Sequence, residues 1–80
     1  MTAGRHVTLL TRAGCHLCDA ARQVVQRTTA VTGSQWSEQD VDTDPELRAE
    51  YGDRVPVVLV DGVEHSHFGV DEDRLRAALV

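Results

Sequence analysis

The order of β-type and α-type patterns at the start of the chain restricts the fold more than any other feature. The segment HVTLLT, residues 6–11, alternates and is rich in β-forming residues, which is typical of a strand. From Leu17 to Val31 apolar residues recur every three or four positions, so we expect a helix whose apolar face joins the core, with Gly33 as its stop signal. Residues 34–41 alternate again and predict a second strand. A strand–helix–strand unit implies a parallel strand pair joined by a right-handed crossover.

Capping signals mark a short second helix in residues 42–52. Asp44 can cap its first turn, and Pro45 suits the first helical position because a proline lacks the N–H that would be unpaired there. Gly52 can end it. About two turns of helix are therefore predicted.

The last part of the chain predicts a hairpin followed by a helix. Residues 55–68 contain two β-type runs joined by Asp61-Gly62, a strong signal for a two-residue hairpin turn. Residues 70–80 carry acidic residues first, arginines later and apolar residues at helical spacing. Together these patterns predict a single α/β domain over residues 1–80, a sandwich of a four-stranded mixed sheet flanked by helices.

Charge and hydropathy argue against several classes of function. The chain of 80 residues has 8 basic and 13 acidic residues, a formal net charge of −5. Nucleic acids and anionic membranes are bound by clustered cations, so neither is an expected partner. No segment is apolar for long enough to span a bilayer, and the first ten residues are too short for a signal sequence. We therefore expect the protein in the cytoplasm, where thiols are kept reduced. We also expect it to be a monomer.

The chain has two cysteines, Cys15 and Cys18, between the first predicted strand and the first predicted helix. A bond between them would close a very short loop, which stabilises a fold least, so a structural bridge is not expected. Helix N-termini carry unpaired N–H groups and a positive dipole, which should lower the pKa of the Cys15 thiol. Arg12 and a protonated His16 could add positive charge, whereas Asp19 should disfavour a Cys18 thiolate.

These environments predict different roles for the two sulfur atoms. Their spacing allows both side chains to share one helical face within disulfide reach. We expect the Cys15 thiolate to attack a partner disulfide, and Cys18 to displace the product and leave an intramolecular bond that a reductant later opens. This dithiol chemistry uses no tightly bound metal or organic cofactor.

The segments VTLLTRAGCHLCDAARQVV, RVPVVLVDG and FGVDEDRLRAAL resemble the glutaredoxin family of the thioredoxin fold, in particular its small bacterial glutaredoxin-like branch. The resemblance covers essentially the whole chain, and its most specific part is the C-x-x-C motif followed by Val-Pro ahead of a hairpin. It implies a thioredoxin-like sandwich in which Cys15 is the nucleophile and Cys18 the resolving thiol.

The resemblance also implies a substrate-binding set around the cysteines. Pro56 matches the family's cis-proline, beside which the backbone of Val55 pairs with the substrate like a short strand. Arg12 matches a basic residue that meets a thiol peptide's carboxylate. The other positions in this set are His16 and Leu17 between the cysteines, and Gly69, Asp71 and Glu72, where glutaredoxins hold the far end of glutathione.

Departures from the family pattern leave the reductant open. His16 and Leu17 replace the usual proline and aromatic residue, Phe68-Gly69 replaces a Gly-Gly pair, and Glu72 replaces an aspartate. Disulfide-containing proteins are the expected substrates. Glutathione, another low-molecular-weight thiol or a protein reductase could each supply the electrons.

Two other classes of function also stay open. Cys15 and Cys18, with or without His65 and His67, could hold zinc or copper, since alternate residues on a strand share a face. Alternatively, the chain could be a binding domain that keeps the fold while its thiols do little.

Overall fold

The computed structural model describes residues 5–80. Residues 1–4, which fall in the predicted domain and in the segment considered as a signal sequence, lie outside the described residues. The helices and strands are β1 (His6–Thr11), α1 (His16–Thr32), β2 (Gln35–Asp40), α2 (Pro45–Tyr51), β3 (Val57–Val60), β4 (Val63–His67) and α3 (Glu72–Leu79), with single 3-10 turns η1 (Val41–Thr43) and η2 (Gly52–Arg54) on either side of α2. The predicted order of strands and helices is confirmed.

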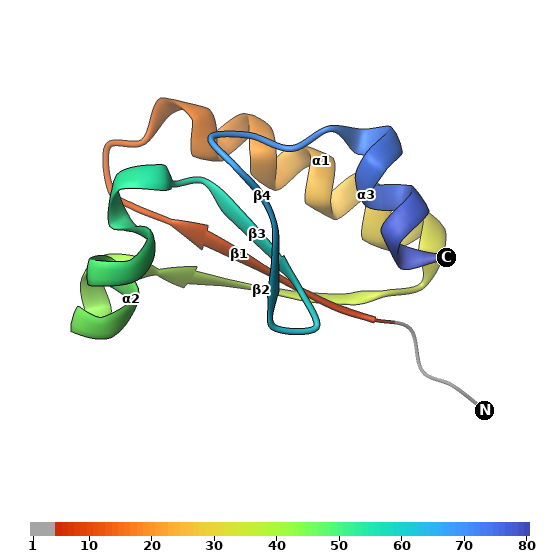
Figure 1. Ribbon diagram of the computed structural model, residues 1–80. Coiled ribbons are helices and arrows are strands. Elements are labelled where there is room, and N and C mark those ends of the chain that lie inside the picture. Colours follow the sequence, from red (N-terminus) through yellow and green to blue (C-terminus); the bar gives the residue numbers. More distant parts are fainter. Residues whose placement is uncertain (1–4) are drawn as a thin grey trace.

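The strands form one mixed sheet in the order β2-β1-β3-β4. β1 is parallel to β2 and antiparallel to β3, and β4 returns antiparallel beside β3. α1 and α3 lie together over one face, while α2 lies at the end of the sheet where β1 and β2 finish (Figure 1). Among residues 5–80, no helix combines the length and apolar character needed to cross a membrane.

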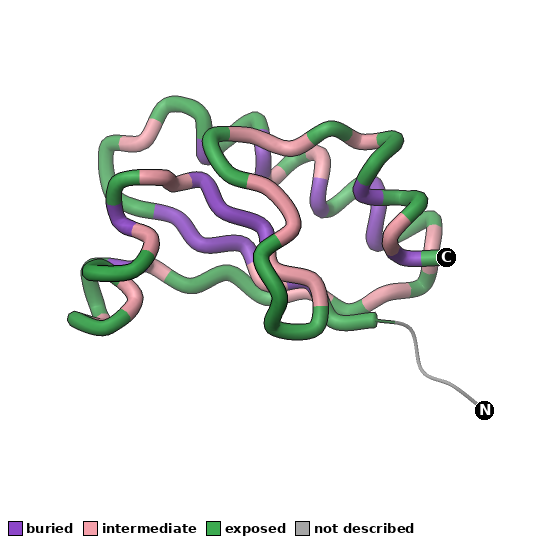
Figure 2. Tube along the Cα trace, in the orientation of Figure 1, coloured by how far each residue is buried: buried purple, intermediate pink, exposed green. Residues whose placement is uncertain are grey.

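Alternation along the strands divides the core between the two faces of the sheet. Leu9 on β1 packs toward α1 and α3, against Val25 and Leu75. Its neighbour Leu10 points the other way, against Val57 and the residues around α2. Buried residues accordingly run along the central strands and the inner sides of α1 and α3 (Figure 2). The site described below lies at the edge where this core meets the start of α1.

The local turn and cap signals act as predicted. The Asp44 carboxylate accepts hydrogen bonds from the backbone N–H groups of Glu46 and Leu47, at 2.9 and 3.3 Å, and so caps α2. Asp61 and Gly62 have φ values of 52° and 85°, and positive φ at both central residues is the requirement of the tight hairpin turn. These short-range interactions depend on adjacent residues, which is why the sequence alone could indicate them.

The predicted apolar face of α1 is only partly correct. The buried side chains include those of Cys18, Ala21 and Val25, whereas Leu17 is 55% exposed and Val31 74% exposed. The buried stripe is therefore narrower than the apolar pattern suggested. Leu17 lies on the side of the helix that faces solvent at the start of α1, where it is available for contacts with other molecules.

Gly52 follows the last residue of α2 as its C-cap, as the sequence predicted, but it lacks the left-handed conformation usual for a glycine at this position. It keeps a right-handed conformation, with φ −55°, and the chain continues into η2. Gly52 is buried, and a Cβ atom there would lie 3.3 Å from Cγ of Arg48 and 3.6 Å from Nη1 of Arg12. The glycine is thus suited to close packing of two arginine side chains, and no left-handed turn is involved.

A bulge in β4 separates the two histidines of the hairpin. Ser66 pairs with Val58, and Glu64 pairs with Leu59, which is the next residue of β3. His65 lies between Ser66 and Glu64 without a partner on β3, so it is the extra residue of the bulge. His67 then lies 3.3 Å from the Glu64 carboxylate. The expectation that alternation places His65 and His67 on one face is therefore wrong, because the bulge breaks the alternation.

Stability should fall as the pH drops through the range in which His65 titrates. Burial, followed by the nearby positive charge of Arg74, lowers the pKa of His65 below its ordinary value of 6.5. The unfolded chain therefore binds this proton at a higher pH than the folded chain does. The contribution of neutral His65 to the free energy of unfolding is complete above about pH 6.5 and is lost below it. We expect His65→Gln to flatten the pH dependence of the free energy of unfolding between about pH 7 and pH 5. Urea titrations across this range measure it, and equal slopes for both proteins would contradict the assignment.

Candidate active site

A turn at the end of β1 brings Cys15 to the beginning of α1. The backbone N–H of Cys15 donates to the carbonyl of Arg12 at 3.2 Å and closes this turn over Ala13 and Gly14. Cys15 has an extended conformation, is half-buried and occupies the N-cap position of α1. At this position a side-chain atom can accept hydrogen bonds from the free N–H groups of the first turn. The predicted location of Cys15 at a helix start is confirmed.

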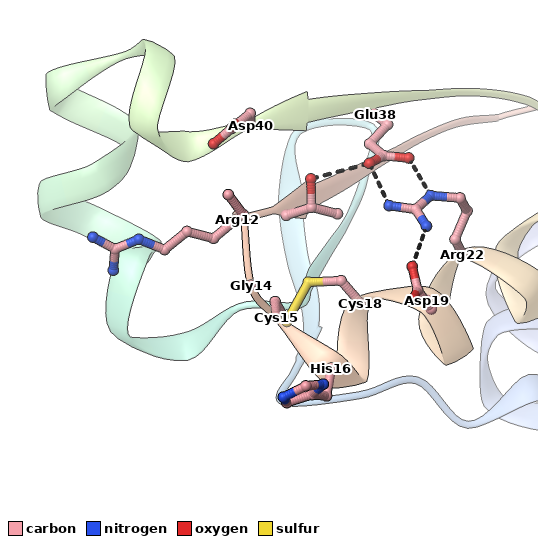
Figure 3. Close-up of a pocket in the computed structure, with 11 residues that line it drawn as sticks. Arg12, Gly14, Cys15, His16, Cys18, Asp19, Arg22, Glu38 and Asp40 are labelled. Carbon is pink, nitrogen blue, oxygen red and sulfur yellow. Dashed lines mark hydrogen bonds and ion pairs between the residues drawn. A yellow bond between two sulfur atoms is a disulfide. The ribbon is translucent and has the colours of Figure 1, made fainter.

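Cys15 and Cys18 are joined by a disulfide bond across the first turn of α1 (Figure 3). Their Cα atoms are 5.4 Å apart, within the usual range for a disulfide. Cys18 is only 2% exposed, and its N–H donates to the Cys15 carbonyl at 3.3 Å. The two residues thus differ in exposure, with Cys15 half-buried and Cys18 buried against the core.

The charged neighbours predicted for this pair are arranged differently from the sequence-based expectation. The Arg12 guanidinium lies 3.1 Å from the Asp42 carboxylate and 3.4 Å from the Gly52 carbonyl, and it extends away from the disulfide (Figure 3). Asp19 forms an ion pair with Arg22 at 2.7 Å. Asp19 is therefore not an isolated charge beside Cys18, and Arg12 is bound to other groups of the chain. His16 is exposed beside Cys15.

The Val55–Pro56 peptide bond is cis, as the family resemblance implied. Val55 is extended and half-buried, and Pro56 is buried at the start of β3. The following loop is tied to this segment, because the N–H of Phe68 donates to the carbonyl of Arg54 at 3.0 Å.

Asp71 and Glu72 both have partners within the chain. The Asp71 carboxylate accepts from the backbone N–H of Arg74 at 3.1 Å and caps α3. Glu72 pairs with Arg27 of α1 at 2.9 Å, and this hydrogen bond lowers the pKa of Glu72. Asp71 thus stabilises the first turn of α3, and Glu72 links α3 to α1.

An apolar groove of about 180 Å³ lies between α1 and the loop after β4. Leu17 and Val24 form one side, and Phe68, Gly69 and Val70 form the other. Phe68 is 55% exposed and has a φ of 62°, which is uncommon for a bulky residue. The sequence indicated Phe68 only as a departure from the Gly-Gly pair of the glutaredoxin family. Its place in a groove could not be predicted, because the groove forms where α1 meets the loop after β4, two segments that are distant in the sequence.

A larger cavity of about 620 Å³ opens beside the disulfide. Both cysteines line it, together with polar side chains from β1, β2 and α1 that the sequence analysis did not single out: Thr11, Arg22, Glu38 and Asp40. One available signal was the alternation of β2, since the parallel register pairs Glu38 with Leu9 and Asp40 with Thr11 and so turns both acids toward α1.

Arg22 and Glu38, which line this cavity, form an ion pair (Figure 3). Two guanidinium nitrogens of Arg22 donate to the two carboxylate oxygens, at 2.6 and 2.7 Å, and Thr11 donates to the same carboxylate at 3.1 Å. The hydrogen bonds from Arg22 in particular lower the pKa of Glu38, so it is ionised at neutral pH. Bidentate geometry of this kind fixes both side chains.

The two histidines considered for a metal site do not join the two cysteines in one group of ligands. His67 contacts Glu64, while His65 is the bulged residue, whose pKa is lowered by burial and by the charge of Arg74. Among residues 5–80, no three histidine, cysteine, aspartate or glutamate side chains are close enough to share a metal ion. A four-ligand site of Cys15, Cys18, His65 and His67 therefore does not fit this fold.

The sheet order, the helix placement, the Cys-x-x-Cys pair at the start of α1 and the cis-proline before β3 define a thioredoxin-like fold. Solved structures support this: a thioredoxin mutant from Halobacterium salinarum matches with a TM-score of 0.71 and 25% identity, over 94% of this chain and 71% of that one. A protein from Nitrosomonas europaea, solved by NMR, matches with a TM-score of 0.85 and 26% identity over 100% and 96% of the two chains.

The chain belongs to the glutaredoxin-like domain family (DUF836), which it matches over residues 6–80. It is also 49% identical over 76 residues to an uncharacterised protein of Mycobacterium tuberculosis, covering 89% of this chain and 78% of that protein. The family resemblance and the fold class predicted from the sequence are confirmed.

Proposed function

We propose that this protein is a glutaredoxin-like dithiol–disulfide oxidoreductase that reduces protein or low-molecular-weight mixed disulfides. The unequal exposure of two cysteines whose sulfur atoms are at bonding distance is the observation that carries this proposal. Cys15 is half-buried at the cap of α1, and Cys18 is 2% exposed at the same helix start. The more exposed Cys15 is placed to meet a substrate first, while the buried Cys18 is placed to attack its partner.

The reaction begins from the reduced dithiol. The Cys15 thiolate attacks one sulfur of a substrate disulfide, so a bond to Cys15 forms, the substrate S–S bond breaks and one thiolate leaves. Cys18, as a thiolate, then attacks the Cys15 sulfur and releases the second substrate thiolate. Two electrons have moved from the protein to the substrate, and the two protons lost by the cysteines end on the two products.

The substrate is held by the segments that surround Cys15. The backbone of Val55, beside cis-Pro56, offers an extended edge to a substrate segment, as in the resemblance. Exposed Leu17 and Phe68 provide an apolar contact for the residues next to the substrate sulfur. His16 lines the cavity beside the disulfide, and Gly69 lines the apolar groove with Leu17 and Phe68. In this proposal Arg12, Asp71 and Glu72 maintain the shape of the site through their contacts within the chain.

A thiol reductant or a reductase closes the catalytic cycle by opening the Cys15–Cys18 bond. Glutathione, another low-molecular-weight thiol or a protein reductase meets this requirement, and no tightly bound cofactor takes part. A cycle of this kind needs a compartment with a supply of reduced thiols, so we assign the protein to the cytoplasm. We propose that it acts there as a monomer with disulfide-containing protein substrates.

A Cys18→Ser variant should accumulate a mixed disulfide through Cys15. Without the resolving thiol, the second displacement cannot occur, and the first adduct persists. We expect incubation of the reduced variant with hydroxyethyl disulfide to give one adduct per chain, located on Cys15 by peptide mass spectrometry. The wild-type protein, treated in parallel, should give the intramolecular bond. An adduct-free variant under conditions that oxidise the wild-type protein would overturn the proposed function.

A further inference from the structure

The walls of the 620 Å³ cavity beside the disulfide contain two arginines whose charges are already compensated. Arg22 donates to both oxygens of Glu38 and also to Asp19. Arg12 donates to Asp42 and to the Gly52 carbonyl. An anionic ligand entering the cavity would have to displace these internal partners before it could pair with either guanidinium.

Asp40, in contrast, leaves its negative charge open to the cavity. It lines the cavity, and within residues 5–80 it forms no ion pair. Its Oδ1 accepts a hydrogen bond from the backbone N–H of Asp42 at 2.8 Å, which fixes the position of the carboxylate without neutralising it. An amine or guanidinium group in the cavity could therefore form an ion pair with the Asp40 carboxylate.

Asp40 also belongs to a strongly acidic part of the sequence. Residues 38–53, the acidic segment, contain seven of the 13 acidic residues and a single basic residue, Arg48. Arg12 and Arg22 compensate two of these charges from outside the segment, and a negative excess remains. The segment starts at the cavity wall and continues through α2, so its field acts on any molecule that approaches Cys15 from this side.

We propose that the disulfides reduced at this site carry a positive charge beside the disulfide bond, and that anionic disulfides, oxidised glutathione included, are disfavoured. This inference rests on the proposed function and adds the charge class of its substrates. Negative potential raises the local concentration of cations and repels anions, and it acts mainly on the association rate. The electron balance is that of the exchange above: the reduced dithiol and R–S–S–R give the protein disulfide and two R–SH.

Three small disulfides of different charge test the inference. The reduced protein is mixed with cystamine, hydroxyethyl disulfide or dithiodiglycolate, which are cationic, neutral and anionic, and the reaction is followed by quenching and mass spectrometry. Each second-order rate constant is divided by that of dithiothreitol with the same disulfide, which removes the intrinsic reactivity. At low salt we expect this normalised rate to be about tenfold higher for cystamine than for dithiodiglycolate. The ratio should approach one near 0.5 M salt, where the screening length is only about 4 Å.

Matched variants locate the source of the preference. Asp40→Asn keeps the hydrogen-bond acceptor and removes the charge, so it should lower the low-salt ratio about threefold. Asp73→Asn changes the net charge equally, but on α3 where Asp73 is exposed and paired with Arg76, and it should leave the ratio unchanged. If both variants lower the ratio equally, the preference comes from net charge and the assignment to the cavity is overturned.

Disulfide-linked peptides distinguish the two sources of such a cation. One peptide has lysine next to its cysteine, and its counterpart has glutamate. A preference for cystamine alone identifies small amine disulfides, and a preference shared by the lysine peptide identifies basic protein segments. Equal normalised rates, or faster reaction of the anionic probes, would overturn the inference. Reaction with none of the probes would overturn the proposed function itself, so the two failures are distinguishable.

Discussion

The Cys15→Ser variant is expected to lose at least about a thousandfold in its rate of disulfide reduction, because it removes the more exposed of the two cysteine thiols. Exchange requires a thiolate to approach a disulfide sulfur directly. Cys18 is 2% exposed and faces the core from the first turn of α1, so it cannot replace Cys15. The measurement is the second-order rate constant with hydroxyethyl disulfide, starting from fully reduced protein.

The control for this loss is the Cys18→Ser variant, in which the same replacement of sulfur by oxygen is made at the other cysteine. It keeps the outer thiol and should form its first adduct at a rate within about tenfold of the wild-type protein. Circular dichroism of both variants verifies that each remains folded. If Cys15→Ser retained most of the rate while Cys18→Ser lost it, the roles of the two sulfur atoms would have to be exchanged.

The parts of the fold that the sequence predicted are those encoded by neighbouring residues. Asp44 caps the helix that Pro45 begins, and Asp61-Gly62 forms the hairpin turn, through contacts that span only a few positions. Cys15 and Cys18 belong to the same class, since three positions separate them and one helix start contains both. For such features the local pattern already determines the geometry.

The features that the sequence did not reveal depend on register and on distant segments. Glu38 meets Arg22 only because β2 lies beside β1 with Glu38 facing α1, and nothing in the residues near either side chain indicates this pairing. His65 is itself the one extra residue of the bulge in β4, which removes it from the alternation that His67 follows, and no local signal marked this bulge. Arg12 follows the same rule, since its partners Asp42 and Gly52 lie far along the chain.

The position of the loop after β4 depends on how α3 is held, which has a direct consequence for stability. α3 has only eight residues, a length at which a helix is not stable by itself in water. It is held by Leu75 and Leu79, which are buried against α1 and the sheet, and by the exposed pair between Arg27 and Glu72. The apolar contacts contribute most of the attachment, because exposed ion pairs stabilise a fold by less than about 1 kcal/mol.

Leu75→Ala is therefore expected to lower the free energy of unfolding by about 2–5 kcal/mol, through lost apolar burial and the cavity that remains. Leu75 is fully buried, and a domain of this size has only about 5–15 kcal/mol in total. Val31→Ala removes an aliphatic side chain that is 74% exposed on α1 and should cost less than about 0.5 kcal/mol. Urea unfolding followed by circular dichroism measures both, and Leu75→Val provides a smaller step if Leu75→Ala does not fold. Equal costs for Leu75→Ala and Val31→Ala would show that α3 does not depend on this core contact.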